Sequence, residues 1–323
     1  MTGKAMPRQG LWRNTPPALF PPVLGLLGLG HGWRRAVEVF SFPAGPVELF
    51  LGAVSLLFLF LLVAYAAKVI RRPAVVIEDM RILPGRAGLA TIGMAMMLLA
   101  VVALPYSRPL AAAIVALAVL VHGAVVLVAL KVLWRAPLPQ RRMTPVWHLI
   151  FVGLIVAPIA AIPLGWSAFS EWVLILTTAA AITIWAGSAV GLARAAVPAP
   201  LRPTLAIHLS PLCLIGMNLY LAGAVQASLW VGYAAIAGAG VLLARARWLT
   251  ATGFSPLWGA FTFPLAAFAV HMLMLAASYG GVFRLIGGAA LIGGTLLIPA
   301  IAWRVLKMWG SGMLAIKTNA ASV

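Results

Sequence analysis

Long apolar runs, separated by short segments that carry the basic residues, dominate this sequence. The chain is 63% hydrophobic and only 9% charged, whereas a soluble domain carries roughly a quarter charged residues. One helix needs about 20 mostly apolar residues to cross the hydrocarbon core of a membrane. The runs predict an all-α integral membrane protein with ten spans at 17–36, 46–69, 87–105, 109–133, 145–165, 169–193, 203–224, 227–245, 256–278 and 282–305.

The basic residues are distributed unevenly between the two sides of these spans. With ten spans both termini lie on one side, and of the 23 lysines and arginines only Arg34, Arg35, Arg108 and Arg284 fall on the other. Since cytoplasmic loops of membrane proteins are enriched in lysine and arginine, we expect both termini in the cytoplasm and the protein in the cell (inner) membrane. The net charge of +18 is then a topology signal and implies no nucleic-acid partner. The expected organisation is a cytoplasmic tail (1–14), a membrane transport domain (15–308) and a second cytoplasmic tail (309–323).

Internal prolines occur mainly in the odd-numbered spans. Pro22 lies in the first span, Pro158 in the fifth, Pro211 in the seventh and Pro264 in the ninth, whereas the second, fourth, sixth and eighth spans have no internal proline. An internal proline removes a backbone hydrogen bond and bends the helix. Such helices are tolerated at membrane depth where they are buried in protein or line a wet cavity. We therefore expect kinked odd spans around a pore and even spans facing lipid, with kinks that only improve packing as the alternative.

Motifs for enzymatic or metal chemistry are missing from the sequence. No span carries an acidic residue well inside it, no two histidines stand at i and i+4, and H-E-x-x-H does not occur. Cys213 is the only cysteine, which excludes an internal disulfide and a multi-cysteine metal site. We expect neither an enzyme nor a bound metal or cofactor.

Four polar residues near the prolines are candidates for the pore. His208 and Ser210 precede Pro211, so they either offer hydrogen-bond donors to an anion or satisfy the interrupted backbone. His271 lies on roughly the same helix face as Pro264 and is either a pore group or a helix–helix hydrogen bond. Thr262 faces the pore or bonds back to its own helix.

Three stretches of the sequence resemble a known family of membrane proteins. They are SPLWGAFTFPLAAFA (255–269), TPPALFPPVLGLLGLG (15–30) and RILPGRAGLA (81–90). Each is similar to the tellurite-resistance/dicarboxylate transporter family, which includes bacterial tellurite-resistance channels, fungal malate permeases and plant slow-type anion channels. The resemblance covers the whole ten-span plan.

This resemblance implies five helical hairpins in a quasi-fivefold arrangement, with the odd helices lining a central pore, and a homotrimer. It also implies that a phenylalanine of the ninth helix occludes the pore. That residue is Phe263 in F-T-F-P or, if the register differs, Phe261. A ring in a narrow apolar bore gates by occlusion and dewetting, and a kink at Pro264 would move Phe263 off the regular helical track.

The function we expect is a membrane anion channel or transporter. Its partners are the lipid bilayer and small anions, such as chloride, nitrate, a dicarboxylate or an oxyanion such as tellurite, and no residue discriminates among these. The first alternative is a proton-coupled carrier for a dicarboxylate or tellurite. The second is a ten-span metabolite exporter built from two similar halves, although residues 1–160 and 161–323 show no convincing similarity.

Overall fold

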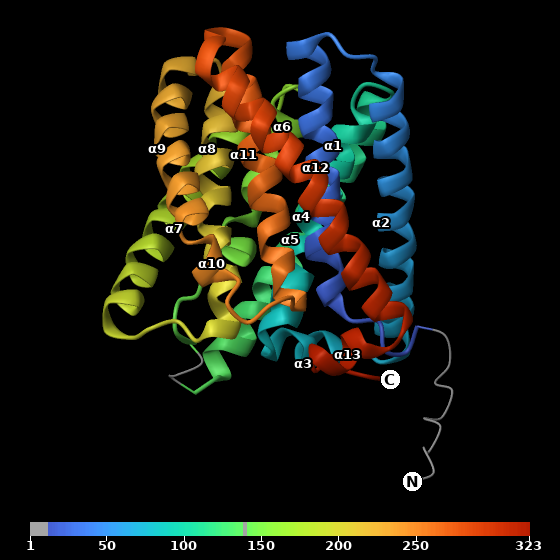
Figure 1. The fold of residues 1–323 in the computed structure, drawn as a ribbon. Helices are drawn as coiled ribbons and strands as arrows, with labels where there is room; N and C mark the ends of the chain where they lie inside the picture. The colour runs from blue at the N-terminus through green and yellow to red at the C-terminus, as the bar shows by residue number, and fades with distance from the viewer. Residues whose placement is uncertain (1–11, 138–140) are drawn as a thin grey trace.

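The computed structural model describes residues 12–137 and 141–323 as a bundle of helices, without a strand in these two ranges (Figure 1). Residues 1–11, most of the expected N-terminal tail, lie outside the described residues. Within them, eight helical stretches are long and apolar enough to cross a membrane. They are α2 (Gly45–Arg71), α4 (Leu83–Ala103), α5 (Arg108–Arg135), α7 (Ser167–Arg194), the 3₁₀ helix η5 (Ala199–His208) with α8 (Leu209–Leu221), α9 (Val225–Ala244), the 3₁₀ helix η6 (Pro256–Trp258) with α11 (Gly259–Tyr279), and α12 (Gly281–Gly310). The chain is thus an all-α, multi-pass membrane protein.

Two of the ten predicted spans take other forms. The first corresponds to a short 3₁₀ helix, η1 (Pro17–Leu19), followed by α1 (Phe20–Phe40). The fifth is a π-helical turn, η3 (His148–Val152), a 3₁₀ turn, η4 (Gly153–Val156), and the single-turn helix α6 (Pro158–Ala161). An α-helix cannot run regularly into Pro158, because proline lacks the N–H and its ring clashes with the preceding turn. Short helices α3 (Val75–Arg81), α10 (Ala246–Leu249) and α13 (Met313–Lys317) lie between or after the spans.

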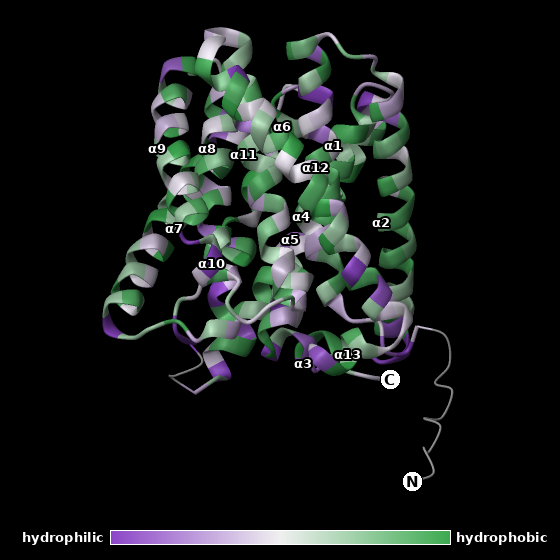
Figure 2. Ribbon diagram, viewed as in Figure 1, coloured by the Kyte–Doolittle hydropathy of each residue, from purple (hydrophilic) through white to green (hydrophobic). Residues whose placement is uncertain are grey.

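Burial divides the long helices into an inner and an outer group. Most residues of α1, α4, α8 and α11 are buried, whereas only about a third or fewer of the residues of α2, α5, α7, α9 and α12 are buried. α1 packs against α4 and α11, α11 packs against α8, and η4 and α6 contact both α4 and α8. These five inner segments therefore contact one another in a closed cycle. Hydrophobic residues cover the outer helices, and hydrophilic residues gather toward the ends (Figure 2).

Glycines bring α1 and α11 into close contact. A Cβ placed on Gly25 would overlap the side chain of Thr262, and one on Gly32 would lie 3.0 Å from Leu291 of α12. Small residues at such interfaces let helix backbones approach one another. Between α11 and α12 the chain turns at Gly280, with φ of 57°, a left-handed conformation that glycine adopts without steric cost.

The prolines of the inner segments lie at or near changes of helix type. Pro22 and Pro211 lie in the first turns of α1 and α8, and Pro158 is the first residue of α6; each follows a 3₁₀ helix. Proline is well tolerated there, because the first N–H groups of a helix have no intrahelical partner. Pro264 lies in the second turn of α11, which remains helical through it. At or near Pro22, Pro158 and Pro211, where kinks in long spans were predicted, the chain changes from 3₁₀ to α-helix.

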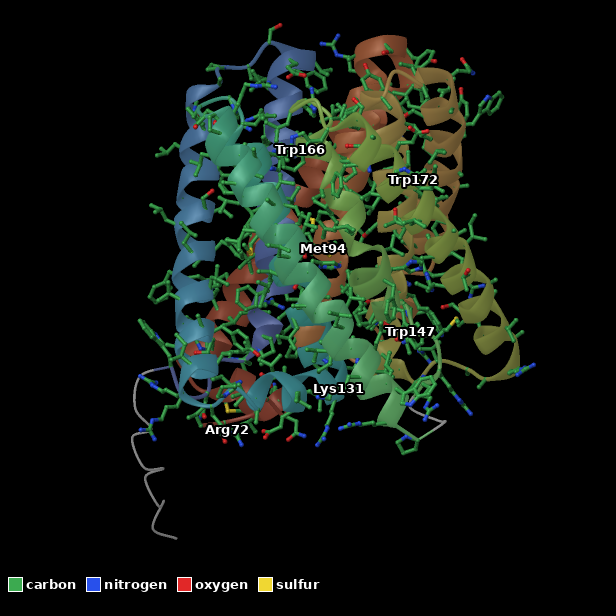
Figure 3. All side chains as sticks on the ribbon, turned by 180° about the vertical axis from the view of Figure 1, so that it is seen from behind. Arg72, Met94, Lys131, Trp147, Trp166 and Trp172 are labelled. Atoms are coloured by element: carbon green, nitrogen blue, oxygen red, sulfur yellow. The ribbon has the colours of Figure 1, made fainter. Side chains whose placement is uncertain are left out.

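A buried ion pair fastens both ends of the described chain to the same end of the bundle. Lys68 Nζ lies 2.9 Å from Asp79 Oδ2, with both side chains fully buried. Lys68 also donates to the carbonyl of Thr15, and Asp79 accepts from the backbone N–H of Ala321. Arg72 and Lys131 lie toward this end, and Trp166 lies in the opposite half (Figure 3).

Candidate functional site

The five inner segments enclose a central cavity of about 170 Å³. Each inner segment contributes to its wall, and apart from His31 and the charged residues at the mouth the lining side chains are apolar. The lining residues include Gly28 and His31 of α1, Leu98 and Val101 of α4, Ile159 of α6, Leu214 and Met217 of α8, and Phe263, Ala267, Val270 and Met274 of α11. Its mouth is formed by Arg34, Arg35, Glu38 and the α4–α5 loop, on the side that holds few basic residues.

Two smaller cavities, of about 20 and 30 Å³, lie among the same five segments. They share Pro21, Leu149, Ile207, Gly259 and Ala260 in their walls, so they adjoin each other. A cavity of this size has room for one or two water molecules, since one water needs roughly 10–15 Å³. The inner segments therefore leave empty space at two places along the bundle, the 170 Å³ cavity and these two smaller cavities.

Phe263 stands between the large cavity and the small ones. In the described chain it is the one residue that lines both the 170 Å³ cavity and the 20 Å³ cavity. Its side chain is only 5% exposed. Phe261 is half-buried, its ring lies 5.7 Å from that of Trp258, and it lines none of these cavities. The geometry thus distinguishes the two candidate phenylalanines.

His31 is a lining residue that the sequence reasoning missed. Its side chain is 8% exposed, and its Nε2 lies 3.1 Å from the carbonyl oxygen of Leu98. The available signal was its spacing: three residues after Gly28, it lies on the same helix face. His31 is the one histidine among the described residues that line this cavity.

The charges at the mouth are largely paired. Arg34 makes two hydrogen bonds to the carboxylate of Glu48, at 2.6 and 2.8 Å, and Arg35 pairs with Glu38 at 2.9 Å. Tyr106 donates to Glu48 at 2.8 Å, and this hydrogen bond raises the pKa of Tyr106. The mouth is therefore less positive than its arginines alone would make it.

The other two arginines of this side do not line the cavity. Arg108 donates to the carbonyl of Pro163, and the guanidinium of Arg284 lies 4.9 Å from the ring centre of Phe40. Of the four arginines that the sequence places here, only Arg34 and Arg35 are positioned to act on an anion at the mouth.

Two of the four polar candidates lie beside Phe263. Ser210 lines the 20 Å³ cavity, and its Oγ has no hydrogen-bond partner among the described residues. Thr262 Oγ1 lies within hydrogen-bonding distance of two carbonyl oxygens, at 3.1 Å from Pro21 and 2.7 Å from Gly259. Thr262 thus joins α11 to the start of α1, whereas the hydroxyl of Ser210 remains unpaired in the described chain at the 20 Å³ cavity.

The two histidine candidates lie away from this axis. His208 Nδ1 is 2.9 Å from His148 Nε2, and His208 lines a separate pocket at the side of the bundle. His271 Nε2 is 3.1 Å from Ser228 Oγ, in the contact between α11 and α9. The structure therefore does not bring them together with Phe263. No group of His, Cys, Asp or Glu suited to a metal ion occurs in residues 12–137 and 141–323.

A bundle of apolar helices whose buried segments surround a cavity is typical of membrane transport proteins. The sequence profile of the voltage-dependent anion channel family, SLAC1, matches residues 14–306. The chain belongs to this family, and the predicted relationship to the tellurite-resistance/dicarboxylate transporters is thereby confirmed. A comparison with curated proteins gives no match. Family membership indicates an anion channel or transporter in a membrane, and members of the family are not enzymes.

Proposed function

We propose that the chain is an anion channel of the cell membrane, with a central pore that Phe263 occludes. The inner segments line the pore, and the ten spans form five hairpins in quasi-fivefold order. The observation that carries the proposal is the position of Phe263, the one described residue shared by the cavities on its two sides. When the ring turns aside, these cavities join into a continuous path.

Two features of the bore favour anions. Its described walls contain no acidic residue below Glu38 at the mouth. The first turns of α8 and α11 contribute Ser210, Gly259 and Ala260 to the 20 Å³ cavity. Ser210 Oγ has no hydrogen-bond partner among the described residues, so its hydroxyl can donate to a passing anion. The permeant ions we propose are small anions: chloride, nitrate, a dicarboxylate or an oxyanion such as tellurite.

The orientation and assembly complete the proposal. Both termini are cytoplasmic, because the basic residues concentrate on their side, and residues 15–308 form the transport domain between two tails. The assembly is a homotrimer, as in the related channels. The exposed apolar side chains of the outer helices, among them Leu56, Leu120 and Leu296, suit contact with lipid and with neighbouring subunits.

Anion flux from liposomes tests the gate. Replacing Phe263 with Ala opens the path between the cavities, so flux should rise at least about tenfold, which corresponds to roughly 1.4 kcal/mol removed from the barrier. The matched control is Phe261→Ala, which removes a ring of the same size from the same helix but from outside the cavities. Equal flux through both variants would refute the proposed role of Phe263.

The proton-coupled carrier remains a second candidate because of His31, which lines the 170 Å³ cavity, called the outer cavity below. For a channel, flux follows the anion gradient, does not saturate at low concentration and is unchanged by an imposed pH gradient. For a carrier, a pH gradient drives uptake, and His31→Gln abolishes that drive. His208 and His271 line neither the outer cavity nor the 20 Å³ cavity, so their replacement leaves coupling unchanged in both cases. A metabolite exporter is disfavoured, since drug-sized ligands occupy pockets of about 300–1,000 Å³.

A further inference from the structure

A pocket near the basic side of the bundle does not belong to the central axis. It has a volume of about 490 Å³ and lies between the C-terminal third of α7, residues 142–145 and η5. Figure 1 shows this end of α7, drawn in yellow-green, inclined away from the other helices. The inclination opens a space at the side of the bundle, where a membrane protein faces lipid.

Three hydrogen-bonding atoms in the wall of this pocket are buried and have no partner among the described residues. They are Ser188 Oγ, Thr144 Oγ1 and His208 Nε2. Ser188 is only 6% exposed. His208 is held in place by its other ring nitrogen and by its backbone. Its Nδ1 lies 2.9 Å from His148 Nε2, and its carbonyl oxygen accepts a hydrogen bond from Trp185 Nε1. Buried polar atoms in proteins nearly always have a partner, so three such atoms around one pocket point to a ligand with polar atoms.

Two arginines without partners stand at the same pocket. Arg142 and Arg194 line it, and neither makes a hydrogen bond or ion pair with a residue that the structure describes. The adjacent Arg141, by contrast, donates to the carbonyls of Ala136 and Trp134. Arginine binds phosphate oxygens through paired N–H donors. The two free guanidinium groups thus supply the charge that a phosphate ligand needs.

The remaining wall is apolar and open toward the membrane. Its apolar residues include Leu83, Met143, Val190, Leu192, Val197 and Leu205. On α7, Val190 is 50% exposed and Leu192 is 45% exposed. A water-soluble anion would leave these side chains bare, whereas the acyl chains of a lipid would cover them. Basic pockets between membrane helices on the cytoplasmic side are known binding sites for anionic lipid headgroups.

We propose that this pocket binds one anionic phospholipid of the leaflet on the basic side. Arg142 and Arg194 bind the phosphodiester. The hydroxyl groups of Ser188 and Thr144 donate to the ester carbonyl oxygens below it, and His208 Nε2 provides a third polar contact. The acyl chains run along α7 over Val190 and Leu192. The lipid fills the space between α7 and η5 and so braces α7 against the bundle.

Native mass spectrometry of the purified full chain with added phosphatidylglycerol tests this site. A Cβ at Gly191 has no neighbour within 4 Å, so Gly191→Trp fits the fold and fills the pocket, and it should abolish the tightly bound lipid. Gly240→Trp is the matched control. Gly240 also has no neighbour within 4 Å and lies near the C-terminal end of another outer helix, α9, so the lipid should remain. Loss in both variants, or in neither, overturns the proposal.

The arginines and the lipid class provide a second, independent measurement. Arg142→Gln with Arg194→Gln should weaken phosphatidylglycerol binding about 25-fold, or about fivefold for each basic residue near the surface. Arg245→Gln with Arg247→Gln removes two charges from the same side but outside the pocket, and should leave binding unchanged. Phosphatidylcholine and water-soluble glycerophosphoglycerol should not displace the lipid. Displacement by the soluble headgroup would show a simple phosphate site. Loss of the oligomer in Gly191→Trp without a change in lipid binding would show that this face is a contact between copies. Either result contradicts the proposal.

Discussion

The ring of Phe263 lies against the bare backbone of Gly28. A Cβ placed on Gly28 would lie 3.3 Å from Phe263 Cδ2 and 2.9 Å from the Cβ of Ala266. Glycine inside a helix costs about 0.5–1 kcal/mol relative to alanine. At this position it allows α1 to approach α11 and leaves room for the aromatic ring of Phe263.

Gly28→Ala should therefore destabilise the protein, although alanine favours helices. The added methyl group overpacks the α1–α11 contact, at a cost of about 1–3 kcal/mol, and thermal unfolding in detergent should occur at a lower temperature. Adding Ala266→Gly removes the closest clash and should restore most of the loss. Gly123→Ala in α5, where a Cβ meets nothing within 4 Å, is the control and should not destabilise. A Gly28→Ala protein as stable as this control would contradict the close contact.

The paired charges at the mouth predict a salt-dependent effect on conductance. Glu48→Gln leaves the charge of Arg34 unbalanced beside the cavity. Anion conductance at low salt should rise by up to about fivefold, since two unit charges 4 Å apart in water interact by ~1 kcal/mol. At 1 M salt the effect should vanish, because the Debye length falls to about 3 Å. The control, Tyr106→Phe, removes a hydrogen bond to Glu48 without changing charge and should leave conductance unchanged. An increase in Glu48→Gln conductance that persists at 1 M salt would exclude an electrostatic cause.

The buried pair Lys68–Asp79 should be far more important for stability than the exposed pair Arg72–Glu78. Asp79→Asn leaves a buried ammonium group without its partner, which costs about 3–5 kcal/mol, and it also weakens the contact that holds Ala321. Glu78→Gln breaks a pair whose side chains are 41% and 38% exposed, and should cost at most about 1 kcal/mol. Thermal unfolding and limited proteolysis of the C-terminal residues measure both effects. Equal melting temperatures for the two variants would disprove the structural role of the buried pair.

Much of the membrane architecture can be predicted from the sequence, because it follows from local composition. The outer helices have to be apolar along their whole length, and α2, α5, α7, α9 and α12 match predicted spans. The predicted difference between odd and even spans agrees with the observed burial, although proline alone does not predict it, because α4 is buried without a proline beyond its first turn and α12 contains Pro299. The mixture of π, 3₁₀ and α turns in 148–161 could not be predicted, because its form depends on packing against α4, α7 and α8.

The candidate site was less accessible to sequence reasoning. The family resemblance proposed Phe263 or Phe261, but only the positions of the cavities separate the two rings. His208 and His271 look alike in the sequence as polar residues near prolines. Their partners, His148 and Ser228, are 60 and 43 residues away, so no local pattern reveals that neither histidine lines the central cavities. The predicted bounds 17–36 place His31 near a span end, where a histidine is unremarkable, whereas α1 extends to Phe40 and His31 lies at its middle.

The most direct measurement of the central claim is single-channel recording in planar bilayers of a series of residues at position 263. Phenylalanine, leucine and alanine place side chains of decreasing volume between the 170 Å³ cavity and the 20 Å³ cavity, which Phe263 lines on both sides. If the ring at 263 occludes the pore, anion conductance should increase in that order, with Phe261→Ala no different from the unmodified protein. The same small conductance for all three residues at 263, with correctly folded protein shown by size-exclusion chromatography, would contradict the account.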